Sequence, residues 1–303
     1  MKATGKLVVM GLVMSVAMQL MILLTGCSTI SNWFGANATN YVDDVIGLIT
    51  NNIDAIKTTG TARRAVIGYC RSVDPDAYGG WPGDLPDTDV DGETVAQMCR
   101  DAGFAPGEIV VLTNQDATAA NFERAIKDAC AVLGSNDLLA VFFSGHGGQV
   151  ADPLDPSEED GMSETLCLYD GQYVDNRFGM LLRQMPAHLR LWFCTDTCNS
   201  GSNYRNLPPA QRPKLVLRGF VPRTDEGTVQ VIHWGGCADG ETSQSTGSGG
   251  TFTTAIVDAS DPAGTWKSYP PKIKAAMKGS GQVPYFGEYG PVSDYFRNSL
   301  FLR

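Results

Sequence analysis

The chain has 303 residues, of which 43% are hydrophobic and 18% are charged. This length and composition suit one large domain or two small ones with a full core, and they indicate neither wholesale disorder nor a fibrous repeat. The net charge of −10 argues against a general nucleic-acid binder, because such a protein needs a basic face to neutralise phosphates.

The N-terminus has the pattern of a secretory signal. Residues 1–6 carry two lysines and no acid, and residues 7–24 are almost all apolar. A Leu-Thr-Gly-Cys sequence ending at Cys27 follows, and it resembles the bacterial lipobox. We therefore expect residues 1–26 to be a lipoprotein signal peptide, Cys27 to carry the lipid, and the protein to be exported and anchored to a membrane. The alternative is an uncleaved anchor helix, although this apolar run is at the lower limit for crossing a bilayer.

Beyond the signal, the chain alternates between predicted strands and helices. Residues 27–61 suit a tether with one short helix, because apolar residues recur at helical spacing from Val42 to Ile56. The predicted strands are Ala65–Cys70, Glu108–Thr113, Leu138–Ser144, Leu189–Thr195, Val229–Trp234 and an edge strand at Ser299–Leu302. The predicted helices are Glu93–Ala102, one from a Thr118 cap to about Leu133, Asn176–Met185 and Thr251–Ala259. This order predicts an α/β fold, with a mostly parallel sheet covered by helices on both faces.

Two predicted strands lead into unusual sequences. Leu138–Ser144 is followed by Gly-His-Gly-Gly around His146, and Leu189–Thr195 by Asp-Thr-Cys-Asn-Ser-Gly around Cys198. Active sites of parallel sheets lie beyond the carboxyl ends of strands, so the two residues would face each other if these strands are neighbours. His146 could then take the proton of the thiol and later protonate a leaving amine. Backbone N–H groups of Gly147 and Cys198 would be placed to hold the oxyanion.

The other histidines and cysteines do not compete for this role. His188 lies in a proline-containing loop, and His233 alternates within a predicted strand, where a core or sheet-face position is expected. No Cys-x-x-Cys occurs, so a zinc site is not expected. The pairing of the six cysteines other than Cys27 and Cys198 stays open.

The His and Cys motifs, with Glu-Glu-Asp-Gly at 158–161 and Gly-Cys-Ala-Asp at 236–239, resemble the caspase-like peptidases and specifically the metacaspases. The resemblance covers roughly residues 63–303. It implies a caspase-like fold with a sheet of about six strands, a peptidase domain at 62–303, and a dyad formed by Cys198 and His146. It also implies that no cofactor is required for the chemistry and that the protein is a monomer.

The resemblance further implies cleavage of protein or peptide substrates after Arg or Lys, through an acidic pocket. Asp196 and Ser144, each two residues before a member of the dyad, match pocket positions of the family. Asp91 matches the second pocket acid, and Thr88 stands where the family often has Cys. Two carboxylates would favour a cationic side chain by direct pairing. The alternative for Asp91 is a solvated or helix-capping acid.

Many metacaspases need calcium, and the resemblance assigns two ligands here. Asp160 and Asp175 match two of the family's acidic ligands. Asn176 replaces a common Asp, and Arg205 occupies the region where another acid is expected. Oxygen-rich sites suit Ca²⁺, but the loss of two charges should weaken binding. Calcium dependence is therefore left open.

Residues 202–228 form a basic connector in an otherwise acidic chain. Its basic residues are Arg205, Arg212, Lys214, Arg218 and Arg223. Caspase-like enzymes are often cut in this region, so we hypothesise that the enzyme trims itself where its preferred residues occur. The alternative is an ordinary solvated loop.

Two other functions remain under consideration. A catalytically silent caspase-like binding module usually lacks the Cys or the His, and this chain has both. A different cysteine hydrolase or transpeptidase of related fold would keep both residues and differ in its substrate. Neither the natural substrate nor the biological process follows from the motifs, because function depends on the site and its context.

Overall fold

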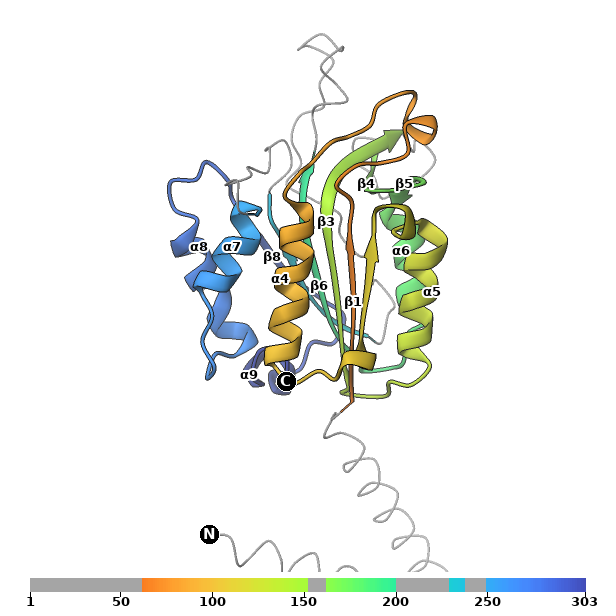
Figure 1. The fold of residues 1–303 in the computed structure, drawn as a ribbon. Helices are drawn as coiled ribbons and strands as arrows, with labels where there is room; N and C mark the ends of the chain where they lie inside the picture. The colour runs from red at the N-terminus through yellow and green to blue at the C-terminus, as the bar shows by residue number, and fades with distance from the viewer. Residues whose placement is uncertain (1–61, 152–161, 200–228, 238–248) are drawn as a thin grey trace, which may run out of the picture. The chain divides into compact units, whose positions relative to one another are not determined.

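The computed structural model of the chain describes residues 62–151, 162–199, 229–237 and 249–303 (Figure 1). The predicted signal peptide with Cys27, the tether, the helix between Val42 and Ile56, Asp160 and the connector 202–228 lie outside these residues. Within the four described stretches, no helix has both the length and the apolar character needed to span a bilayer.

One mixed sheet organises the described residues. Its main path runs in the order β2-β1-β3-β6-β7-β8, and β4 and β5 extend from the far part of β3. The strands are β1 Arg63–Tyr69, β2 Ile109–Thr113, β3 Leu138–Ala151, β4 Met162–Leu168, β5 Gly171–Val174, β6 Arg190–Asn199, β7 Gln230–Gly235 and β8 Tyr285–Tyr289. From β2 to β7 the main path is parallel, and β8 joins it antiparallel. The predicted α/β class and the mostly parallel sheet are confirmed.

The predicted edge strand at Ser299–Leu302 is wrong. Leu300 forms only an isolated antiparallel bridge to Thr265, and the edge position belongs to β8. β8 has the sequence Tyr-Phe-Gly-Glu-Tyr, which lacks the apolar run by which the central strands were recognised. β4 was missed for a similar reason, because Glu164 and Thr165 interrupt its apolar residues.

Helices cover both faces of the sheet. They are α4 Thr88–Asp101, α5 Ala119–Cys130, α6 Asp175–Leu182, α7 Thr251–Asp258, α8 Tyr269–Ala276 and α9 Asp294–Asn298. In Figure 1, α4, α7 and α8 lie on one side of the sheet and α5 and α6 on the other. The predicted Thr118 cap is confirmed, since its side chain accepts from the N–H of Asn121 at 3.2 Å. α8 was not predicted from the sequence, because its first turn holds two prolines. Prolines in the first turn are compatible with a helix, since they remove no intrahelical hydrogen bond there.

The alternation of the central strands divides the core into two layers. Along β3, Val141 and Phe143 belong to the cluster formed with α5 and α6, whereas Ala140 and Phe142 belong to the cluster formed with α4, α7 and α8. Successive side chains of a strand point to opposite faces. The next residue of the second series is Ser144, so the alternation brings its side chain to the α4 side of the sheet.

The close approach of α4 to the sheet depends on Gly92. A Cβ at this position would overlap the ring of Tyr69, the last residue of β1. Without a side chain at Gly92, the helix lies directly against the carboxyl end of β1. The preceding residue, Asp91, is thereby buried next to the sheet.

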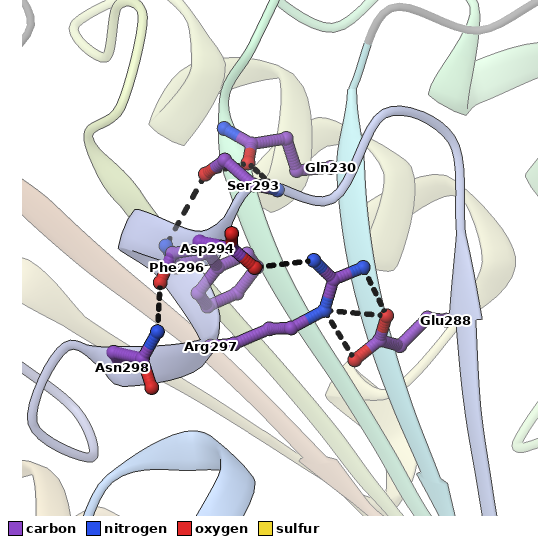
Figure 2. Close-up of polar contacts among 7 residues, drawn as sticks. All are labelled: Gln230, Glu288, Ser293, Asp294, Phe296, Arg297 and Asn298. Carbon is purple, nitrogen blue, oxygen red and sulfur yellow. Dashed lines mark hydrogen bonds and ion pairs between the residues drawn. The ribbon is translucent and has the colours of Figure 1, made fainter.

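Polar contacts tie the C-terminal residues to the sheet (Figure 2). The backbone N–H and the hydroxyl of Ser293 donate to Gln230 Oε1 at 2.9 and 2.6 Å. The same hydroxyl oxygen caps α9 by accepting from the N–H of Phe296 at 3.2 Å. Arg297 of α9 pairs with Glu288 of β8, with Nη2 and Oε2 2.7 Å apart. These contacts join α9 and the residue before it to β7, through Gln230, and to β8, through Glu288.

His233 of β7 is a buried, neutral side chain. Its ring lies 5.1 Å from that of Phe193 and 5.4 Å from that of Tyr285, between ring centroids. Among the described residues, neither of its ring nitrogens has a hydrogen-bond partner. Burial lowers its pKa to about 3, because desolvation disfavours the charged form. The expected core position of His233 is confirmed, and His188 is exposed in the turn before β6.

Replacing His233 with Phe should reduce the sensitivity of the fold to acid. The unfolded chain binds a proton at His233 below its ordinary pKa of 6.5, whereas the folded chain does so only near pH 3, so stability falls as the pH drops through this window. We expect the wild type to lose about 2 kcal/mol more than His233→Phe between pH 7 and pH 5, measured by urea unfolding. His188→Asn, at an exposed histidine, is the matched control. Parallel slopes for wild type and His233→Phe would contradict the assignment.

Candidate active site

The pairing of β3 with β6 brings His146 and Cys198 together. The two strands are parallel neighbours, and their register pairs the Cα of His146 with that of Cys198. Both strands run further than the sequence indicated, β3 to Ala151 and β6 to Asn199, so the two residues lie within paired strands and not in loops beyond them. Gly145 and Gly147, on either side of His146, are therefore part of the sheet.

The loop between β1 and α4 covers the imidazole of His146. Nε2 of His146 lies 3.2 Å from the carbonyl oxygen of Gly83, and the ring centroid lies 4.6 Å from that of Trp81. A carbonyl can only accept, so Nε2 carries the hydrogen and Nδ1 is the basic nitrogen. Burial lowers the pKa of His146, and the hydrogen bond to Gly83 opposes this effect. The ring is therefore held in a neutral form that can accept a proton at Nδ1.

Three of the predicted pocket residues form a buried polar cluster on the α4 side of the sheet. Ser144 of β3 pairs in register with Asp196 of β6. The Ser144 hydroxyl donates to Asp91 Oδ2 of α4 at 2.7 Å. Each of the three residues is at most 3% exposed. Asp91 is thus a buried acid that faces the sheet. The alternative role given above, a solvated or helix-capping acid, does not apply.

The N-terminus of α7 holds both carboxylates. The N–H of Gly250 donates to Asp91 Oδ1 at 2.6 Å. Thr253 donates to Asp196 Oδ2 twice, from its N–H at 3.0 Å and from its hydroxyl at 2.7 Å. A Cβ at Gly250 would overlap the Asp196 carboxylate and lie 3.0 Å from Asp91 Oδ2. Sequence reasoning missed both Gly250 and Thr253, and the only signal was a Gly-Gly-Thr-Phe-Thr helix start.

The cluster keeps a proton near neutral pH. Burial, and next the charge of Asp196, raise the pKa of Asp91 to about 7, while the hydrogen bonds from Gly250 and Ser144 act in the opposite direction. Two carboxylates so close together and away from water cannot both ionise without cost. A cation bound between them would remove that cost. The cluster therefore suits the binding of a positively charged group.

Thr88 and Gly147 were also assigned to the site, and their roles stay predictions. Thr88 begins α4, and its hydroxyl donates to the Leu85 carbonyl oxygen at 3.3 Å. Thr88 is buried one helical turn before Asp91, on the same face of α4. Gly147 lies between two strands, with Leu166 of β4 and Asn199 of β6 as its Cα partners. A role for Gly147 in holding an oxyanion stays a prediction.

The calcium ligands are only partly visible. Asp175 begins α6 and is 1% exposed, and its Oδ1 accepts from the N–H of Asn176 at 2.8 Å. Asp160 lies outside the described residues. In the part of the chain that the structure describes, no three His, Cys, Asp or Glu side chains gather in a way that could hold a metal ion. Calcium binding stays a prediction.

Among the described residues, none of the six cysteines whose pairing was open forms a disulfide. They are Cys70, Cys99, Cys130, Cys167, Cys194 and Cys237. Burial raises the pKa of Cys70, Cys99 and Cys167 to about 12, so these thiols stay protonated at neutral pH. These three thiols are therefore not poised as nucleophiles.

Known proteins resemble this chain in sequence and in fold. Residues 67–285 match the family model described as the caspase domain. Metacaspase-1 of Schizosaccharomyces pombe is 34% identical over 144 residues, which cover 44% of this chain and 33% of that protein. Metacaspase-1A of Aspergillus fumigatus is 28% identical over 209 residues, which cover 51% of this chain and 50% of that protein.

The fold comparison agrees with the sequence comparison. A crystal structure of a Geobacter sulfurreducens protein matches with a TM-score of 0.66 and 28% identity, covering 79% of this chain and 97% of that one. The chain spans between a third and a half of the length of the two curated relatives above. Because the family model covers well over half of the 303 residues, the chain belongs to the caspase-domain family, and the two curated relatives above are metacaspases.

Proposed function

We propose that the protein is a cysteine endopeptidase with Cys198 as nucleophile and His146 as base. The observation that carries this proposal is the register of β3 and β6, which pairs the two residues. Membership of the caspase-domain family and the neutral, oriented ring of His146 support it.

The proposed reaction uses the tautomer that Gly83 selects. Nδ1 of His146 takes the proton of the Cys198 thiol, and the thiolate attacks the scissile carbonyl carbon of the substrate. The N–H groups of Gly147 and Cys198 hold the oxyanion that forms. His146 then gives its proton to the leaving amine, which leaves an acyl-enzyme. Water, activated by the same histidine, hydrolyses the acyl-enzyme and restores the thiol.

We further propose that the preferred residue before the cleaved bond is Arg or Lys. Asp196 precedes Cys198 by two positions, which is about 6.6 Å along a strand. That distance is comparable with the length of an extended basic side chain, so the cation would reach Asp196 and Asp91 while its carbonyl lies at Cys198. Pairing with the cation offsets the cost of ionising both buried carboxylates.

Other parts of the proposal depend wholly or partly on residues outside the described stretches. We propose that a lipid on Cys27 tethers the enzyme on the exported side of a membrane, and that the enzyme trims itself within 202–228. We also propose that Asp160 and Asp175 bind calcium that stimulates the enzyme. The enzyme is proposed to act as a monomer, and no step of the reaction above needs a cofactor.

Loss of either dyad residue should abolish turnover. We expect Cys198→Ala and His146→Ala each to lower kcat/KM on a fluorogenic peptide ending in Arg by about 1,000-fold or more, because the two residues act as a unit. Cys130→Ala, at a half-buried thiol away from the site, should retain wild-type activity. Turnover that survives Cys198→Ala would refute the assignment. An absence of turnover on any peptide, with or without Ca²⁺, would favour a silent binding module.

The preference for basic residues should depend on pH through Asp91. Its pKa is raised to about 7, so the carboxyl becomes charged as the pH rises through 7, and kcat/KM for Arg peptides should rise over the same range. Asp91→Asn should remove this rise, because the amide does not titrate. Asp196→Asn should increase KM for Arg peptides by about 10- to 100-fold, because it removes a charged hydrogen-bond acceptor. Asp294→Asn, at an exposed acid, is the matched control. A preference for peptides ending in Asp would contradict the pocket assignment.

Self-trimming should require the nucleophile. When wild type and Cys198→Ala are purified and their fragments are mapped by mass spectrometry, only the wild type should show cuts after Arg or Lys within 202–228. Replacement of the five basic residues in that connector by Gln should also prevent the cuts. Identical fragments from wild type and Cys198→Ala would show that another protease makes them.

A further inference from the structure

The loop that covers His146 is fixed by backbone hydrogen bonds. The N–H of Val73 donates to the carbonyl of Pro82 at 2.9 Å, and that of Leu85 donates to the carbonyl of Arg71 at 2.6 Å. The two bonds attach the segment Trp81–Gly83 to the residues that follow β1. They therefore fix the position of this segment relative to the end of β1.

The indole of Trp81 also contacts a second aromatic ring. Tyr78 meets it edge-on, with ring centroids 6.0 Å apart. The Tyr78 hydroxyl donates to the carbonyl of Leu168, at the end of β4, at 2.7 Å. A continuous line of contacts thus runs from β4 through Tyr78 and Trp81 to the imidazole of His146. Neither the proposed dyad nor the acidic cluster requires an aromatic ring at Trp81.

We propose that Trp81 is a positioning residue for His146, whose indole holds the imidazole against the Gly83 carbonyl and keeps water from one face of the ring. Its effect on turnover rests on the proposed peptidase function. Its effect on His146 itself does not, because the state of the ring can be observed without substrate.

The indole and the carbonyl have separate effects on the ring. The Gly83 carbonyl can only accept, so it selects the tautomer with hydrogen on Nε2. A water molecule that took its place at Nε2 could also donate, and would therefore allow the tautomer with hydrogen on Nδ1. The indole blocks that water and limits the tilt of the ring. Burial is the larger influence on the pKa of His146, and it lowers it. An indole also attracts an imidazolium, which acts in the opposite direction, so removal of Trp81 should give a net rise.

The experiment is an NMR titration of the full chain with ¹³C,¹⁵N-labelled histidine. The chain has three histidines, and His146→Gln assigns the relevant signals. In wild type and Trp81→Phe, we expect His146 to titrate below its ordinary value of 6.5 and to show ¹⁵N shifts of the Nε2–H tautomer. In Trp81→Ala, we expect the pKa to rise toward 6.5 and the tautomers to mix. On Arg peptides, kcat should fall about tenfold in this variant with little change in KM, because the base is misplaced and the pocket is not.

The signals of His188 and His233 report whether a variant is folded. If Trp81→Ala disturbs them, Trp81→Leu takes its place, since leucine fills part of the space without an aromatic face, and the same direction of change is expected. An unchanged pKa and tautomer in a folded variant would overturn the proposal, and so would a loss of kcat without any change at His146. If wild type cleaves no peptide, the peptidase proposal fails, while the titration still decides the role of Trp81.

Discussion

The parallel pairing of β3 with β6 is the constraint on which the site depends. One register places His146 beside Cys198 and Ser144 beside Asp196. The spacing of two residues within each strand then relates the proposed dyad to the acidic cluster. A slip of one residue in this pairing would send one set of side chains to the opposite face of the sheet. The two helices that complete the cluster, α4 and α7, pack on the face to which Ser144 points.

Electrostatic cost shapes the rest of the cluster. Burying Asp91 next to Asp196 is unfavourable, and the structure offsets this with donors from Ser144, Gly250 and Thr253. The remaining cost appears as the raised pKa of Asp91, and a bound cation would relieve it. In the proposed enzyme, the repulsion between the two buried carboxylates thus makes the empty pocket unfavourable. The same repulsion favours a substrate with a cationic side chain.

Sequence reasoning located the parts of the fold that are buried on both faces. β1, β3, β6 and β7 are near-continuous apolar runs, which is why they were recognised. β4 and β8 mix polar and apolar residues, so tertiary pairing alone defines them. His146 and Cys198 were found from their flanking residues, and Asp91 only through resemblance to a family. Gly250 and Asp91 are 159 positions apart, and no local pattern announces such a contact. Trp81 was missed for the same reason.

The assignment of Cys198 as nucleophile beside an acidic pocket is tested most directly with a peptidyl-arginine chloromethyl ketone. The protein is analysed by mass spectrometry after reaction with this reagent. This reagent places a basic side chain in the pocket and an electrophile at the nucleophile. We expect one adduct, on Cys198, which His146→Ala and Asp196→Asn both suppress. An adduct on a different cysteine, or equal labelling of Cys198 by the corresponding aspartyl reagent, would contradict it.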